Sequence, residues 1–240
     1  MKNQELLRTV LEKFGKKIKG SEYSLDARIP LSYLFSMGMS RGFMLVRGFV
    51  KQGVTMHYKK LFCGHGVKLK CKSKLMIHDG VTFGNNTYID ALSEEGAYFG
   101  KACSLGSGVI IRCSGNMKQI GKGVHMGDNT ALADHSFVGA TGGVWIGDNT
   151  ICGQNTRFHS SNHNFRDMDE LIRKQGITAK GIRLGENCWV GAGAVFLDGA
   201  SIGNGCVVAA NAVITKEFPD NCIIAGVPAK IIGWRNEKMA

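Results

Sequence analysis

Residues 184–219 read LGENCW VGAGAV FLDGAS IGNGCV VAANAV ITKEFP, which is six consecutive units of six residues. Each unit opens with a large apolar residue, the second residue is often glycine, and the fifth is small in five of the six units. The opening residues are Leu184, Val190, Phe196, Ile202, Val208 and Ile214. A six-residue period fits neither a helix nor an ordinary strand. It is typical of a solenoid, in which the inward residues of neighbouring coils stack on one another.

The same period runs upstream to about residue 75. The further opening residues are Ile77, Phe83, Ile89, Phe99, Leu105, Ile111, Ile120, Met126, Leu132, Val138, Ile146, Cys152 and Phe158. Steps such as Gly84-Asn85 and Gly203-Asn204 suit corners at which the backbone must reach positive φ. We therefore predict a mainly β solenoid over residues 61–227, in which three units, or about 18 residues, complete one triangular coil.

The composition agrees with a folded solenoid. Glycine makes up 33 of the 240 residues against 3 prolines, and 44% of the residues are hydrophobic. These proportions exclude a disordered chain, and the lack of a Gly-X-Y period excludes collagen. The eight cysteines form no CxxC pair, and the first ten residues are polar rather than a secretory signal. We therefore expect reduced thiols in a cytoplasmic protein.

The positive charge is concentrated at the N-terminus. Residues 1–60 hold twelve Lys and Arg against four Asp and Glu, whereas residues 61–240 hold 18 against 15. Residues 4–19 predict an amphipathic helix, and residues 29–50 form an apolar segment interrupted by Arg41 and Arg47. Two arginines and three glycines argue against a spanning helix. Two readings stay open: residues 1–50 lie on a membrane surface at its inner face, or they pack on the main domain or another subunit.

The hexads resemble the hexapeptide-repeat acyltransferases, and the resemblance is strongest over residues 146–233. The segments IGDNTICGQNTRFHSSNHNF and IRLGENCWVGAGAV…AGVPAKIIG are similar to the maltose and galactoside acetyltransferases and to their lipopolysaccharide- and capsule-modifying relatives. This resemblance implies a left-handed parallel β-helix over residues 61–227. The charge and hydropathy pattern predicts a basic helical arm over residues 1–60, and we expect a C-terminal tail over residues 228–240. The resemblance also implies a homotrimer, acetyl-CoA as co-substrate and a saccharide acceptor.

His163 is the expected general base. Acyl transfer to a hydroxyl needs a base, and histidine is suited to this role near neutral pH. The hexad pattern breaks after Phe158, and residues 163–179 form a polar excursion with His163 at its root. Loops that leave a rigid scaffold are common places for active sites. In the resembling enzymes the catalytic histidine stands 17 residues after the opening residue of an IGDN-type hexad, which here leads from Ile146 to His163.

Three further residues are weaker candidates for contacts with the acceptor. His159 lies four residues before His163 and would orient it or touch the acceptor, although an ordinary turn role fits equally well. Asp134 and His135 fall about where the resembling enzymes contact their sugars. The specific Asn and Asp of those enzymes are replaced here by Ala133 and Thr141, which makes a galactoside or maltose acceptor doubtful.

The resemblance also assigns residues to the acyl donor, and they are Trp189, Ala192, Ala210, Thr215, Lys216 and Lys230. Trp189 would lie by the thioester, Ala192 and Ala210 would offer backbone groups to the pantetheine arm, and the last three would approach the phosphates. A lysine at position 230 pairs with a phosphate as a point charge. A solvated coil edge is the plain alternative for Thr215 and Lys216.

With these residues, the resemblance implies an acetyl-CoA-dependent O-acetyltransferase that acts on a sugar hydroxyl, in a polysaccharide of the capsule or O-antigen type. An N-acetyltransferase of an aminosugar or a xenobiotic is the first alternative. The second is a zinc protein of the γ-carbonic anhydrase type, with His135, His159 and His163 as ligands, and the third is a non-enzymatic scaffold. Under the main prediction no metal is expected. No nucleic-acid partner is expected either, because the basic arm has no aromatic platform or recognised motif.

Overall fold

The computed structural model describes residues 9, 12–13, 24–26, 28–52, 59–115, 117 and 119–236. The chain divides into two compact units, Met1–Met44 and Leu45–Ala240. Helix α2 (Leu31–Gln52) runs from the first unit into the second. The helix expected over residues 4–19 lies almost wholly outside the described residues, and the boundary expected at residue 60 stays a prediction. None of the described helices is long and apolar enough to span a bilayer.

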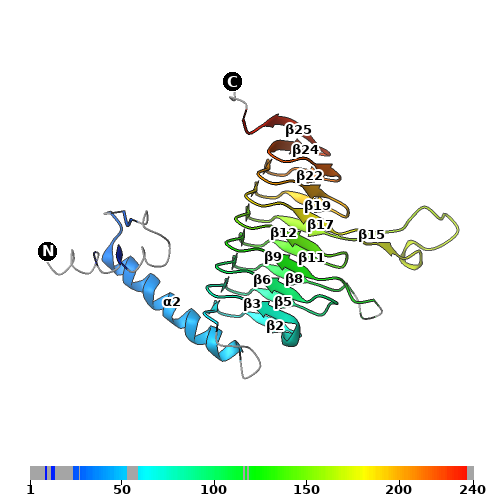
Figure 1. Cartoon of the computed structure of the whole chain (residues 1–240). Helices are drawn as coiled ribbons and strands as arrows, with labels where there is room; N and C mark the ends of the chain where they lie inside the picture. Colours follow the sequence, from blue (N-terminus) through cyan, green and yellow to red (C-terminus); the bar gives the residue numbers. More distant parts are fainter. Residues whose placement is uncertain are drawn as a thin grey trace. The chain divides into compact units, whose positions relative to one another are not determined.

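From Phe62 onward the chain winds coil after coil into three sheets, which we call A, B and C (Figure 1). Sheet A contains β1 (Phe62–Cys63), β4 (Thr82–Phe83), β7 (Ser104–Leu105), β10 (Ala131–Leu132), β13 (Ile151–Cys152), β18 (Trp189–Val190), β21 (Val207–Val208), β24 (Cys222–Gly226) and β25 (Ala229–Trp234). Sheet B contains β2 (Lys68–Lys70), β5 (Tyr88–Asp90), β8 (Ile110–Arg112), β11 (Phe137–Gly139), β14 (Arg157–His159), β19 (Val195–Leu197) and β22 (Val213–Ile214).

Sheet C contains β3 (Leu75–Ile77), β6 (Ala97–Phe99), β9 (Val124–Met126), β12 (Val144–Ile146), β17 (Ile182–Leu184), β20 (Ser201–Ile202) and β23 (Glu217–Phe218). Two short 3₁₀ turns, Lys72–Lys74 and Ile172–Lys174, lie outside the sheets. The strands pair in parallel from coil to coil, except that β25 turns back antiparallel on β24 and caps the last coil. The segment expected as a tail thus contributes a strand.

The interior is built from the first and fifth positions of the hexads. Every predicted opening residue except Ile120 is buried, and Phe83, Phe99, Phe158 and Phe196 are the largest fully buried side chains. The small fifth residues, such as Thr150 and Cys206, are buried as well. Because each coil contacts only its neighbours, this continuous apolar stack holds the coils together.

All variation in coil length lies at one corner, where sheet B leads into sheet C. Inward residues stand six positions apart across the A–B corner, as from Val190 to Phe196, and across the C–A corner, as from Leu184 to Val190. At the B–C corner, 26 positions separate Phe158 from Leu184. The coils are therefore not uniformly 18 residues long, and their extra residues gather along one edge, where a site can be built without disturbing the core.

Ile120 corrects the predicted pattern. It is 42% exposed, whereas the other opening residues are buried. Ile120 lies in an insertion at the B–C corner between β8 and β9, and the inward position of the next strand is Met126. The six-residue period is interrupted by the insertion and starts again after it. Counting by six through the insertion therefore assigns Ile120 to the core incorrectly.

The end of α2 packs closely on the first coil through Gly48. A Cβ atom at this position would clash with the backbone oxygen of Leu61. We expect Gly48→Ala to lower the free energy of unfolding by about 1–3 kcal/mol, because the backbones must move apart. Thermal unfolding of the full chain measures this.

Gly42→Ala in the same helix is the matched control for Gly48→Ala. A Cβ atom on Gly42 meets no atom within 4 Å. Alanine is the better helix former by about 1 kcal/mol, so this change should leave stability equal or higher. Equal effects of the two substitutions would contradict the close approach at Gly48.

Candidate active site

The longest excursion leaves the β-helix after β14 and returns at β17. Its base is a two-stranded antiparallel ladder in which β15 (Asn162–His163) pairs with β16 (Ile177–Thr178), with His163 opposite Ile177. The Asn164 N–H donates to the Gly176 oxygen at 3.1 Å, and the Asn164 side-chain amide donates to the Gln175 oxygen at 2.9 Å. The ladder projects from the solenoid in Figure 1, and it fixes the backbone on which His163 stands.

Gln175 holds the distal part of this excursion together. Its Nε2 donates to the backbone oxygens of Asp167 and Glu170 at 2.8 Å and 2.7 Å, and its Oε1 accepts the Asp167 N–H at 3.1 Å. One side chain thus satisfies three backbone groups of a loop that has few other interactions. The hexad pattern carries no signal for this role, because residues 163–179 lie outside the repeat.

His163 lies at a polar hollow of about 470 Å³. The lining residues are Asn162, His163, Asn164, Phe165, Arg166, Asp167, Glu170, Gln175 and Thr178. His163 is exposed, and within the described part of the chain no hydrogen bond holds its side chain. A base with carboxylates, amides and a guanidinium around it suits a hydroxyl-rich ligand, since each of these groups can bond a hydroxyl.

His159 is the last residue of β14, just before the chain leaves the β-helix. Its ring lies 5.4 Å from that of Phe137. Partial burial, and secondly the positive charge of Arg157, lower the pKa of His159 below its ordinary value. Burial therefore favours the neutral ring, which can donate or accept a hydrogen bond next to the excursion.

Asp134 and His135 lie at a different corner, A–B, where both serve the turn. Asp134 Oδ1 accepts the Ser107 N–H of the preceding coil at 2.7 Å. His135 adopts φ +60°, in the turn position that Asn155 and Asn211 occupy in later coils. The structure does not bring this pair together with His163 in one chain, and their role in acceptor binding stays a prediction.

The residues assigned to the donor spread over three parts of one chain. Trp189 lies on sheet A and is 57% exposed. Thr215 and Lys216 are exposed at the B–C corner after β22, and Lys216 Nζ lies 5.6 Å from the centre of the Phe218 ring. Lys230 stands in β25 opposite Ala225. A single chain therefore does not gather these side chains around His163.

The A–B corner carries a row of backbone donors near the C-terminal end. In two earlier coils an Asn or Asp at the third hexad position accepts the N–H of the preceding coil: Asn85 caps His65 at 2.8 Å, and Asp134 caps Ser107 at 2.7 Å. Ala192 and Ala210 occupy this position in the later coils and have no such oxygen. Among the described residues no acceptor bonds the N–H of Gln154, Ala192 or Ala210. These exposed amides are available to a bound ligand.

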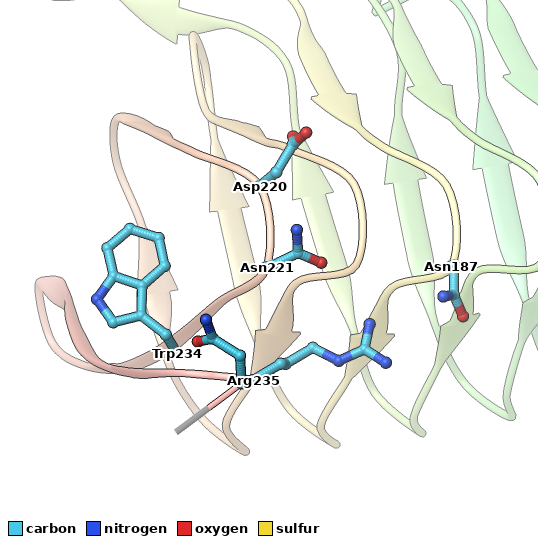
Figure 2. A pocket seen from close by; sticks show the side chains of 6 residues that line it. Asn187, Asp220, Asn221, Trp234 and Arg235 are labelled. Atoms are coloured by element: carbon cyan, nitrogen blue, oxygen red, sulfur yellow. The ribbon is translucent and has the colours of Figure 1, made fainter. Parts of the chain in front are cut away.

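A second hollow, of about 820 Å³, lies at the C–A corner of the last coils (Figure 2). It is lined by Asn187, Asp220, Asn221, Trp234, Arg235 and Asn236. The Arg235 guanidinium donates to the Gly205 oxygen at 2.9 Å, and the Arg235 N–H donates to the Asn221 oxygen at 2.9 Å. The hexad pattern does not predict this hollow, because the hollow depends on β25 folding back beside the turns.

No group of three or more His, Cys, Asp and Glu side chains in the described ranges is arranged to hold a metal ion. The three histidines of the zinc alternative do not form such a group, since His135 lies at the A–B corner while His159 and His163 belong to β14 and β15.

Comparison with known proteins identifies the scaffold. The family model described as bacterial transferase hexapeptide (six repeats) matches residues 181–216. A protein of Escherichia coli described as a lipopolysaccharide biosynthesis O-acetyl transferase is 32% identical over 140 residues, which cover 55% of this chain and 69% of that protein. The galactoside O-acetyltransferase of E. coli is 29% identical over 119 residues, which cover 49% of this chain and 57% of the enzyme.

A protein of Mycobacterium tuberculosis described as an acetyltransferase is 29% identical over 150 residues, with 53% of this chain and 48% of that protein covered. The chain thus spans about half to two thirds of the length of these relatives. The solved structure of AntD, an N-acyltransferase from Bacillus cereus, aligns with a TM-score of 0.49 at 18% identity over 80% of this chain and 89% of that chain. That similarity is too distant to bear on activity.

The sequence period, the three parallel sheets and the match to the hexapeptide transferase family model agree, and the predicted left-handed parallel β-helix is confirmed. The chain belongs to the family of bacterial transferases with hexapeptide repeats.

Proposed function

We propose that this chain is an acetyl-CoA-dependent O-acetyltransferase whose acceptor is a sugar hydroxyl of a cell-surface polysaccharide unit or its precursor. The observation that carries the proposal is His163 at a polar hollow on a braced excursion of a rigid scaffold. The E. coli relative described as an enzyme of lipopolysaccharide biosynthesis supports the class of acceptor.

His163 acts as the general base on the acceptor side. Its imidazole takes the proton of the sugar hydroxyl as the oxygen attacks the thioester carbonyl, and it then returns the proton to the departing thiolate. Asp167, Glu170 and Arg166 line the same hollow and bond the neighbouring hydroxyls, which holds the reacting oxygen against the imidazole. Gln175 keeps this loop in the productive shape through its three backbone hydrogen bonds.

The uncapped backbone N–H groups of Ala192 and Ala210 donate hydrogen bonds to the carbonyl groups of the pantetheine arm. Thr215, Lys216 and Lys230 supply a hydroxyl and two positive charges for the phosphates. In one chain the amides lie at the A–B corner, whereas His163 belongs to the excursion from the B–C corner. This separation favours a homotrimer in which each active site combines His163 of one copy with the donor residues of the next.

The assignment of the amides is tested by Ala210→Asn. An asparagine at this position should cap the Ala192 N–H as Asn85 caps His65. We expect the KM for acetyl-CoA to rise about tenfold, because one hydrogen bond of roughly 1–1.5 kcal/mol is lost to the donor. The value of kcat and the melting temperature should change little. Steady-state kinetics with acetyl-CoA as the varied substrate measure the effect.

Ser107→Asn is the matched control for Ala210→Asn. It introduces the same side chain at the same corner, and it caps the Asn85 N–H several coils away from the proposed donor site. Its KM for acetyl-CoA should equal that of the unchanged chain. If Ala210→Asn behaves like this control, the Ala192 N–H does not bind the donor.

The reaction itself is tested by thiol release from acetyl-CoA. The assay should compare pyranosides and their oligomers with aminosugars and with a chloramphenicol-like acceptor. We expect release that depends on a hydroxyl acceptor and a product that carries an alkali-labile ester. Release with amine acceptors alone would replace the proposed O-acetyl transfer with N-acetyl transfer.

A further inference from the structure

Helix α2 contacts the first coil through its polar and small residues. Arg47 Nε donates to the Cys63 oxygen at 2.9 Å, and the Gln52 side chain both donates to the Lys59 oxygen at 2.8 Å and accepts the Lys59 N–H at 3.2 Å. Gly48 is buried against Leu61. At this end of the helix, polar and small residues therefore face the protein.

The apolar stripe of the same helix is exposed. Phe35, Met39, Phe43, Val46 and Val50 recur three or four positions apart, so they follow one face. Their exposed fractions are 68%, 47%, 56%, 63% and 72%. A helix of a globular protein normally buries such a stripe in its core. This arrangement is the reverse of that rule, and the exposed stripe needs an apolar surrounding.

The surface next to this helix is strongly basic. Residues 27–75 contain ten Lys and Arg and no Asp or Glu. The first coil presents exposed lysines, which are Lys59, Lys60, Lys68, Lys70, Lys72 and Lys74. Lys72 lies directly at the helix end, because its Nζ donates to the Lys51 oxygen at 2.9 Å. Lysines beside an apolar helix are the features that attract anionic lipid.

We propose that this surface, formed by the exposed Val46 and Val50 at the end of α2 and by the lysines of the first coil, binds an anionic lipid bilayer. Val46 and Val50 enter the acyl chains, and the lysines lie at the phosphate groups. A second copy of the chain fits less well, because pairing two such surfaces would bring two sets of lysines together without any acidic partner.

Vesicle flotation of the full chain tests this proposal independently of catalysis. The chain is mixed with phosphatidylcholine vesicles that contain or lack phosphatidylglycerol. We expect it to float with the anionic vesicles and to stay at the bottom with the neutral ones. Val46→Glu, in the stripe, should lower partitioning at least tenfold, and so should Lys60→Glu combined with Lys68→Glu.

Two control variants isolate the surface. Ser40→Glu adds the same charge as Val46→Glu outside the stripe, about 120° around the helix from Val46. Lys101→Glu reverses a lysine beyond the first coil. Both should float like the unchanged chain. The proposal is overturned if the chain does not float, or if Val46→Glu and Ser40→Glu float alike.

A second copy as the true partner would give a different result. Val46→Glu would then reduce the mass measured by light scattering without vesicles, and flotation would not depend on phosphatidylglycerol. Acetyl transfer to a soluble sugar should persist in Val46→Glu under the membrane proposal. Loss of flotation with intact transfer thus separates this inference from the proposed reaction.

Discussion

His163→Ala is expected to lower kcat/KM for acetyl transfer by about 10²- to 10⁴-fold, the usual contribution of a positioned general base. The imidazole is the proton acceptor of the proposed mechanism, and alanine leaves only water in its place. His163 is exposed and lies outside the stacked interior, so the melting temperature should stay within about 1–2 °C. Thiol release with a saccharide acceptor and thermal unfolding measure the two quantities.

The binding of CoA distinguishes a lost base from a damaged site. The dissociation constant for CoA, measured by calorimetry on His163→Ala, should match that of the unchanged chain, because the amides of Ala192 and Ala210 are untouched. His65→Ala removes another exposed histidine, at the first coil, and should keep full activity. Turnover that survives in His163→Ala would remove this residue from the mechanism.

The regular part of the fold could be predicted because the large apolar residue that opens each hexad marks the position in each strand that points into the core. Leu184, Val190 and Phe196 are the inward residues of β17, β18 and β19, which lie in sheets C, A and B of one coil, and each is buried. The count failed at Ile120, since a period has no means of measuring an insertion. All insertions lie at the B–C corner. This is known only from the strand pairing, which cannot be read from the sequence.

The candidate site divides in the same way. His163 was predictable because it stands where the repeat breaks. Gln175 was not, because its three hydrogen bonds depend on how a loop without a period folds back on itself. The open amides at Ala192 and Ala210 had a readable signal, namely alanine at a hexad position that holds Asn or Asp in earlier coils. The turn role of Asp134 was readable from the same hexad position, because an Asp there can accept the N–H of the preceding coil.

Phe196→Ala is expected to lower the free energy of unfolding by about 3–5 kcal/mol. The ring is fully buried and stacks on Phe158 of the preceding coil, with centroids 5.0 Å apart and planes 13° apart. Phe196 also aligns with Ile214 of the next coil, so its removal leaves a cavity between two coils. For a chain of this size the melting temperature should fall by roughly 6–20 °C, measured by calorimetry.

Val195→Ala separates the inward stack from the strand itself. Val195 precedes Phe196 in β19 but points outward and is half-buried, so its removal should cost about 1 kcal/mol or less. Equal losses would mean that the interior stack does not hold the coils. Because coils contact only their neighbours, the cavity at Phe196 should first loosen the coil of Phe158, whose strand β14 leads into the excursion. Acetyl transfer by Phe196→Ala should therefore fail on warming before the calorimetric transition begins, whereas Val195→Ala should lose activity and structure together.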